Sequence, residues 1–212
     1  QDVNNVPHYG VFEIELHADT GDQHPIFDVD FSVVYTRPDE SRVTAEGFYD
    51  GRNTYKCRAY ANVQGDWGWS TQSNLPALND QSGTFTVVQS QLKGQLKHHP
   101  DDPYQFAYDN GDWFLHIGDT GYRYVTDIEP EWRTYIDQAA AAGFTKIRTW
   151  FCRGRSDVQA LFYPERTSLN LPYWQEIDCR MTYALNEHPH IMFKLIPYGE
   201  DTAELRSYDN DP

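Results

Sequence analysis

Residues 131–151 read EWRTYIDQAAAAGFTKIRTWF, and this stretch changes its structural character at a single glycine. Before Gly143, apolar side chains recur at spacings of three and four residues, which predicts a helix over 131–142 directly after Pro130. After Gly143, the run 144–151 predicts a strand. Gly143 itself suits the position just beyond a helix, where a left-handed backbone is common. The stretch therefore indicates an α/β unit.

The flanking sequence repeats this alternation. An apolar run at 113–117 predicts a strand before the helix, and a second helix over 173–186 and a third strand over 190–197 follow. Strand–helix alternation predicts a parallel sheet with right-handed crossovers.

The length of this α/β part favours an incomplete barrel. Residues 111–212 supply 102 residues and three predicted strands, whereas a closed (β/α)₈ barrel takes about 250 residues. Three parallel strands leave two unpaired edges, and two helices do not cover both faces. We therefore expect the first three βα units of a barrel whose remainder lies beyond residue 212 or on another chain. A small three-stranded α/β unit is the alternative.

The first part of the chain has a different pattern. Polar and apolar residues alternate in short segments separated by turn signals, and Asp50-Gly51 lies between two of them as in a tight hairpin. Many short strands without a helical pattern predict an antiparallel β-sandwich. The predicted strands are 9–16, 27–33, 43–49, 54–60, 66–71 and 83–88.

These patterns divide the chain into three parts: a β-sandwich domain at 1–92, a linker and hairpin at 93–110, and the barrel part at 111–212. Within the middle part, 91–103 breaks periodicity and predicts a linker, while Asp109-Asn110-Gly111 predicts a hairpin turn. Asp109 to Asp112 resembles a calcium loop only faintly, because the distal Glu is missing. We expect no metal and no cofactor.

Composition excludes several classes of partner. The chain has 17 Lys and Arg against 32 Asp and Glu, a net charge of −15, and no Lys/Arg cluster in the sequence offsets it. This charge disfavours nucleic acid and anionic membranes, and no apolar stretch approaches the roughly 18 residues of a membrane span. The acidic, ring-rich composition and the start at Gln1 without a Met favour a secreted or periplasmic protein. The three cysteines, Cys57, Cys152 and Cys179, predict free thiols better than a disulfide framework.

Five motifs together resemble bacterial glycoside hydrolases with an N-terminal β-sandwich and a (β/α)₈ catalytic barrel. They are EGFYDG (46–51), YKCRAY (55–60), GDWGWST (65–71), FLHIGDT (114–120) and AGFTKIRTW (142–150). The resemblance implies hydrolysis of a polysaccharide by two carboxylates. In such barrels the general acid follows the fourth strand and the second carboxylate follows the seventh. Neither position has a counterpart here, so the resemblance places the catalytic pair beyond residue 212 and implies that the 212 residues alone are inactive.

Barrel enzymes build their sites at the carboxyl ends of the strands, which selects candidate substrate-binding residues here. They are Asp119, Tyr122, Arg148, Trp150, Tyr198, Glu200 and Asp201. Aromatic rings stack on sugars and carboxylates bind hydroxyl pairs, so the set suits a saccharide. Among them, Glu200 is the candidate for a catalytic acid.

Each candidate also has a structural alternative. Asp119 suits a loop cap, Arg148 a buried ion pair, and Trp150 a core position. Trp67 and Trp69 share one face of a strand, which is more typical of a core than of a carbohydrate platform.

Three functions remain open. The first is a hydrolase of a polysaccharide, for example a marine algal galactan such as agar; a heavily sulfated polymer would be repelled unless Arg and Lys compensate locally. The second is a non-catalytic carbohydrate-binding module. The third is a polysaccharide lyase, for which Tyr122 and Tyr198 are candidate bases.

Overall fold

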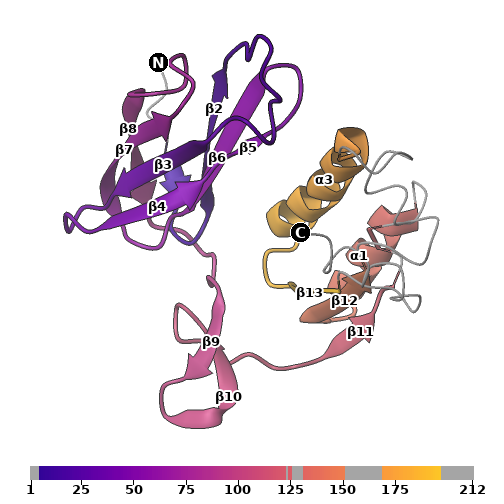
Figure 1. Ribbon diagram of the computed structural model, residues 1–212. Helices are drawn as coiled ribbons and strands as arrows, with labels where there is room; N and C mark the ends of the chain where they lie inside the picture. The colour runs from indigo at the N-terminus through magenta and orange to yellow at the C-terminus, as the bar shows by residue number, and fades with distance from the viewer. Residues whose placement is uncertain (1–4, 123, 126–130, 151–168, 197–212) are drawn as a thin grey trace. The chain divides into compact units, whose positions relative to one another are not determined.

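The computed structural model describes residues 5–122, 124–125, 131–150 and 169–196 (Figure 1). The chain divides into two compact units. The sandwich unit comprises Gln1–Lys97 with Tyr108–Asp112, and the α/β unit comprises His98–Ala107 with Trp113–Pro212. Cys152, Tyr198, Glu200 and Asp201 lie outside the described residues.

Two sheets form the sandwich unit, as predicted. The larger sheet has the order β1-β8-β7-β3-β4 and the smaller has the order β2-β6-β5. The larger sheet contains β1 (Asn5–Pro7), β3 (Phe31–Thr36), β4 (Arg42–Glu46), β7 (Gly65–Ser73) and β8 (Ser82–Val88). The smaller contains β2 (Val11–His17), β5 (Phe48–Tyr49) and β6 (Thr54–Tyr60). All pairings are antiparallel except that of β1 with β8, which is parallel.

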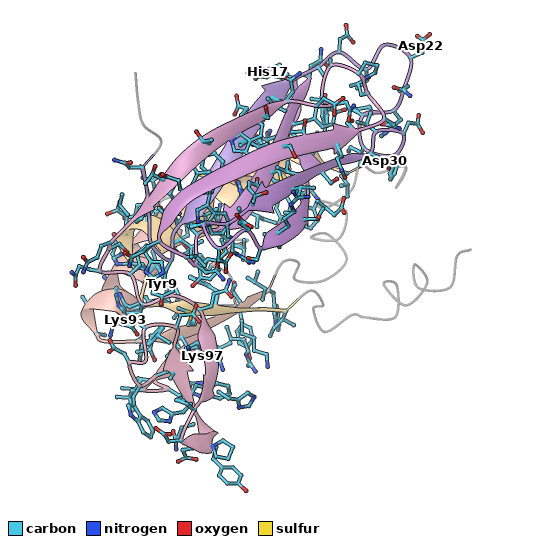
Figure 2. The ribbon with its side chains drawn as sticks, turned by 90° about the vertical axis from the view of Figure 1, so that its left-hand side faces the viewer. Tyr9, His17, Asp22, Asp30, Lys93 and Lys97 are labelled. Carbon is cyan, nitrogen blue, oxygen red and sulfur yellow. The ribbon has the colours of Figure 1, made fainter. Side chains whose placement is uncertain are left out.

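Alternate side chains of both sheets build the core of the sandwich unit. Phe12 from β2 and Phe85 from β8 stack across the two sheets with centroids 3.8 Å apart, and Trp67 from β7 packs on Phe85. Along the strands, Tyr9 and Lys93 lie at one end of the unit, whereas His17 lies at the other (Figure 2). The two-residue period of the sequence therefore appears in the structure as an alternation of buried and exposed side chains.

Two predicted strands of this unit were misplaced. The strand predicted at 27–33 begins only at Phe31, and Phe27 is 66% exposed. The reason is a turn: the His24 backbone N–H donates to the Asp28 carboxylate at 2.8 Å, and the Asp28 N–H donates to the His24 carbonyl at 2.9 Å. Local hydrogen bonding by Asp thus competed with the strand.

The segment predicted as one strand at 43–49 is two strands in different sheets. β4 pairs with β3 and β5 pairs with β6, with Gly47 between them. A side chain at Gly47 would overlap the Phe31 ring, so glycine is required where the chain changes sheets. The hairpin at Asp50-Gly51 is confirmed, since the Asp50 N–H donates to the Thr54 carbonyl at 2.8 Å.

A two-stranded sheet of β9 (Leu96–His99) and β10 (Asp102–Tyr108) follows. β9 lies inside 91–103, the segment predicted as a linker, so this short strand was not predicted. The turn at 109–111 is confirmed: the Gly111 N–H donates to the Tyr108 carbonyl at 2.9 Å, and Ala107 bridges to Trp113.

In the α/β unit, a parallel sheet of β11 (Gly118–Thr120), β12 (Lys146–Trp150) and β13 (Met192–Ile196) is covered on one face by helices. The helices are α1 (Glu131–Ala141) and α3 (Leu171–Glu187). Ile147 of β12 packs with Ile136 of α1 and Ile177 of α3 in one apolar cluster. The predicted parallel alternation is confirmed for the described residues, and Gly143 has a φ of +81° as expected of a residue that ends a helix.

The first strand of this sheet was predicted too early. It lies at 118–120 rather than 113–117, and Trp113, Leu115 and Ile117 are exposed. Parallel pairing begins where the Ile117 carbonyl accepts the N–H groups of Thr145 and Lys146. Upstream of that point Trp113 pairs with Ala107 instead, so the apolar run belongs to another local ladder.

No helix in the described part of the chain has the length and apolarity to cross a membrane. Cys57 is a buried free thiol and Cys179 an exposed one.

Candidate functional site

The candidate site lies on the sheet face that the helices leave uncovered. Side chains of a strand alternate between faces, so Ile147 and Thr149 of β12 are buried on the helix side, while Lys146, Arg148 and Trp150 lie on the other. The register places Thr120, Arg148 and Lys194 side by side on the three strands.

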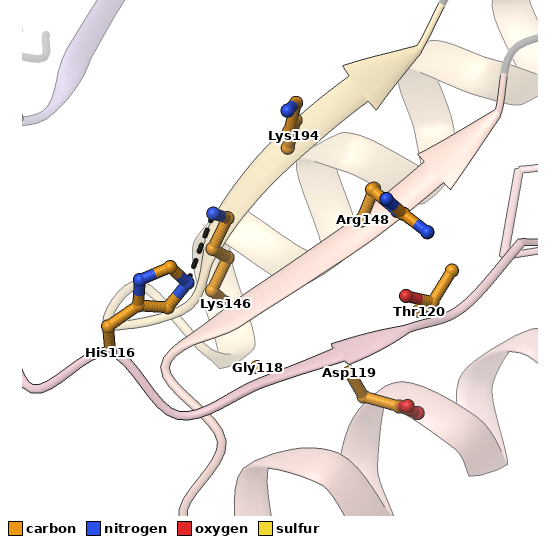
Figure 3. A pocket seen from close by; sticks show the side chains of 7 residues that line it. All are labelled: His116, Gly118, Asp119, Thr120, Lys146, Arg148 and Lys194. Atoms are coloured by element: carbon orange, nitrogen blue, oxygen red, sulfur yellow. Dashed lines mark hydrogen bonds between the residues drawn. The ribbon is translucent and has the colours of Figure 1, made fainter.

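An open pocket of about 430 Å³ occupies this face (Figure 3). Residues of β11, from Gly118 to Thr120, line one side of it. The cationic side chains Lys146, Arg148 and Lys194 line the other, together with His116. The pocket therefore brings three positive charges together in a chain whose net charge is −15.

None of these three cations pairs with a carboxylate among the described residues. Lys146 Nζ lies 3.1 Å from His116 Nε2. Arg148 donates from Nη2 to the Tyr122 hydroxyl at 3.1 Å, and its guanidinium lies 5.5 Å from the Tyr122 ring centroid. Lys194 has no hydrogen bond or ion pair in the described part of the chain.

Two aromatic rings adjoin the cations. The rings of Tyr122 and Trp150 lie 4.4 Å apart between centroids, at 47°. The Trp150 N–H donates to the Tyr122 carbonyl at 3.3 Å, which holds the two residues together. Tyr122 is exposed and Trp150 is half-buried, so one exposed and one half-buried ring lie next to Arg148.

Asp119 points the other way, although it contributes to the pocket edge (Figure 3). Its carboxylate accepts a hydrogen bond from the Tyr135 hydroxyl of α1 at 2.9 Å. Burial, and then this hydrogen bond, raise the pKa of Tyr135 above its ordinary value. Tyr135 therefore stays protonated and keeps donating to Asp119, which ties β11 to α1.

Of the seven predicted site residues, the structure brings together Tyr122, Arg148 and Trp150 and directs Asp119 toward α1. Tyr198, Glu200 and Asp201 lie outside the described residues.

The prediction from sequence missed Lys146, Lys194 and His116. The alternation of KIRTW and MFKLI could have shown that both lysines share the face of Arg148. The register between the strands was needed to show that they are neighbours.

Trp67 and Trp69 of the sandwich unit belong to its core and do not form a carbohydrate platform. Trp67 is 1% exposed, and its Nε1–H donates to the Val63 carbonyl at 2.9 Å. Trp69 is partly buried and packs against the same core. Neither indole forms an exposed platform.

Chemically, the pocket can bind a negatively charged group beside an aromatic surface. Guanidinium and ammonium groups donate strong hydrogen bonds to carboxylates and sulfates. Among the described residues, no group of three or more His, Cys, Asp or Glu side chains is arranged to hold a metal ion.

The structure therefore defines a class of protein with a β-sandwich unit and an α/β unit. The parallel sheet of the α/β unit has an open face that carries basic side chains and aromatic rings. Residues 5–74 match a family described as a domain of unknown function, DUF5060. No curated protein matches the chain significantly.

Among solved structures, a protein from Bacteroides vulgatus described as a putative glycoside hydrolase is similar over 92% of this chain, with 25% identity and a TM-score of 0.76. This chain spans 41% of that protein. A Bacteroides ovatus xyloglucanase aligns over 92% of this chain with 14% identity and a TM-score of 0.28, and the Lin-41 filamin domain aligns over 42% with 15% identity and a TM-score of 0.32.

Proposed function

We propose that this chain is part of a secreted glycoside hydrolase that acts on a polysaccharide, with residues 111–212 forming the first βα units of a (β/α)₈ barrel. The observation that carries the proposal is the likeness of 92% of the chain to the Bacteroides vulgatus protein at a TM-score of 0.76. Because 92% of the chain is covered, the likeness includes residues of the α/β unit as well as of the sandwich unit.

The catalytic carboxylates belong, in this proposal, to polypeptide beyond residue 212. Glycoside hydrolysis needs two carboxyl groups about 5–5.5 Å apart for retention or about 6.5–9.5 Å apart for inversion. On the open face of the described strands the charged side chains are cationic, and Asp119 is directed to α1. This chain spans 41% of the solved Bacteroides vulgatus protein, so that protein has further polypeptide that can supply such groups. Within the 212 residues, Glu200 remains the candidate acid.

Release of reducing ends from a panel of polysaccharides, an algal galactan such as agar included, tests the proposal. The natural full-length polypeptide is compared with the 212-residue chain. We expect turnover by the former and none by the latter, since the chain alone lacks the carboxylate pair. The hydrolase would be rejected if the natural protein were folded and monodisperse with the mass of the 212-residue chain alone. It would also be rejected if the natural protein turned over no polysaccharide.

One contact favours a polysaccharide lyase as the second candidate. A lyase needs a base beside a neutralised uronate, and the Arg148 guanidinium donates to the hydroxyl of Tyr122 while Lys194 lies next to Arg148. Absorbance from unsaturated uronate products distinguishes the two reactions. A lyase would lose that product with Tyr122→Phe, whereas a hydrolase would never form it. A carbohydrate-binding module would release no reducing ends and form no unsaturated uronates.

A further inference from the structure

We propose that Arg180 of α3 is a positioning residue, which holds the connection between β11 and α1 in place at the edge of the sheet where a barrel enzyme builds its site. That edge is formed by the carboxyl ends of the strands, so the role rests on the proposed function. The connection spans 121–130, of which the structure describes residues 121, 122, 124 and 125. Tyr122, a substrate-binding candidate from the sequence, belongs to this connection.

Two crossed hydrogen bonds join the connection to α3. Arg180 donates from Nη1 to the Tyr124 carbonyl at 3.1 Å, and the Tyr124 hydroxyl donates to the Arg180 carbonyl at 2.7 Å. Burial raises the pKa of Tyr124 above its ordinary value, so the hydroxyl stays protonated and continues to donate. Because each side chain binds the backbone of the other residue, the pair fixes the distance between the two backbones.

The burial of Arg180 indicates that its charge serves this contact. The side chain is 7% exposed, and its guanidinium lies over the Trp132 ring, 5.4 Å from the centroid. Burying a charge is costly, and an apolar residue of similar volume is often equally stable at such a position. Arg180 Nε also donates to Glu176 at 2.9 Å, but that carboxylate is 43% exposed and has water as an alternative partner. The Tyr124 carbonyl is the acceptor that an apolar side chain would leave unpaired.

The residues on either side of this contact lie on opposite faces of the sheet. The Tyr122 ring lies near Trp150 on the open face, with centroids 4.4 Å apart. The Tyr124 ring stacks on Phe193 of β13 in the apolar cluster of the helix side, with centroids 5.2 Å apart. The Tyr122 carbonyl accepts the N–H of Trp150, the last residue of β12. The connection therefore crosses the carboxyl edge of the sheet, and Arg180 fixes it from the helix side.

Hydrogen–deuterium exchange of the natural full-length protein, followed by mass spectrometry, tests the contact without any substrate. Arg180→Met keeps an apolar side chain at the position and removes the donors. The amides of 121–125 and of Trp150 should then exchange about tenfold faster, because a hydrogen bond from a charged group is lost. The other amides of β12 should be unchanged. Arg180→Lys keeps one charged donor and should restore most of the protection.

Two further variants separate this contact from general packing. Arg133 of α1 is exposed, and its guanidinium lies over the same Trp132 ring, 4.8 Å from the centroid. Arg133→Met is therefore the matched control and should leave exchange at 121–125 unchanged. Tyr124→Phe removes only the hydroxyl bond and should raise exchange there about threefold. Circular dichroism at the temperature of the assay establishes that each variant is folded.

Kinetics on a polysaccharide that the natural protein hydrolyses test the role at the site. Arg180→Met should lower kcat/KM about tenfold, mostly through kcat, because a displaced connection moves the groups that it carries away from the reacting geometry. Arg180→Lys should recover most of the loss, and Arg133→Met should leave kcat and KM unchanged. The measurements are made well below the unfolding temperature of each variant.

A purely structural Arg180 would give a different pattern. Exchange at 121–125 that is unchanged in Arg180→Met, or that rises equally throughout α1, α3 and β12, would overturn the inference and leave the hydrolase standing. Locally faster exchange with unchanged kcat and KM would overturn the positioning role. If the natural protein hydrolyses no polysaccharide, the hydrolase fails, whereas a local effect on exchange would still support the contact between Arg180 and the connection.

Discussion

At the scale of the residue, Trp67 shows how burial decides what an aromatic ring does. Its place beside Trp69 on one strand face is compatible with a sugar platform or with a core. The structure places its ring against Phe85 with centroids 5.4 Å apart and its Nε1–H on a backbone carbonyl. A ring that is buried against Phe85 and whose N–H is hydrogen-bonded internally stabilises the sandwich unit.

Trp67→Ala should therefore destabilise the sandwich unit by about 3–5 kcal/mol, the usual cost of emptying a buried ring site. Denaturant unfolding followed by circular dichroism measures the change. Phe27→Ala, at a ring that is 66% exposed in the same unit, is the matched control and should cost less than about 1 kcal/mol. Equal effects of the two substitutions would contradict the core position of Trp67.

A second residue-scale feature is the contact of Asp137 on α1 with the end of α3. Asp137 Oδ1 lies 2.6 Å from His188 Nε2, and the Tyr183 hydroxyl donates to the same carboxylate at 3.0 Å. His188, and then Tyr183, hold the pKa of Asp137 below its ordinary value of 3.8. A carboxyl whose pKa is lowered by folding stabilises the protein above its unfolded pKa, and this contribution is lost as pH falls through the folded value.

Asp137→Asn should lower stability at pH 7 by less than about 1 kcal/mol, because the Asp137 side chain is 48% exposed to solvent, which screens its interactions. Urea midpoints of variant and wild type should converge as pH falls below about 4. Asp22→Asn, at an exposed carboxylate of the sandwich unit (Figure 2), should have no effect at either pH. A difference between wild type and Asp137→Asn that persists at about pH 2 would contradict the assignment.

At the scale of the element, the helix–glycine–strand stretch folds as its sequence indicates. Trp132, Ile136 and Ala139 of α1 are buried on one face, and Gly143 ends the helix with a φ of +81°. A Cβ at Gly143 would meet nothing within 4 Å. The requirement for glycine is therefore conformational and not steric.

Gly143→Ala should cost about 1 kcal/mol, because only glycine adopts a positive φ without strain. Thermal unfolding of the α/β unit measures the loss. Gly68→Ala is the control: a Cβ there also meets open space, but its φ is not in the left-handed region. The control should leave stability unchanged or slightly raised. A neutral Gly143→Ala would show that the helix ends differently in solution.

At the scale of the whole molecule, each unit has its own apolar core. The cluster of the sandwich unit contains Trp67 and Phe85, and that of the α/β unit contains Trp132 and Ile147. Units with separate cores can unfold as separate cooperative units. The three-stranded sheet of the α/β unit leaves its outer strand edges unpaired among the described residues, which should make this unit the less stable.

Differential scanning calorimetry should accordingly resolve two transitions, the lower one belonging to the α/β unit. Trp67→Ala should shift only the upper transition, and Gly143→Ala only the lower. A single transition that moves as a whole with either substitution would show that the two units fold as one.

The sequence by itself determined the alternation of both parts: the two-residue period of the sandwich strands and the helices near 131–142 and 173–186. It also placed Tyr122, Arg148 and Trp150 at or after the ends of predicted strands. These follow from local periodicity, which depends only on neighbours along the chain. The tertiary structure alone decided the change of sheets at Gly47, the late start of β11 and the meeting of Lys146, Arg148 and Lys194. Those features depend on strand register, which is set by contacts between segments far apart in sequence. Composition records only the sum of charges, so a chain with a net charge of −15 can still hold a basic pocket.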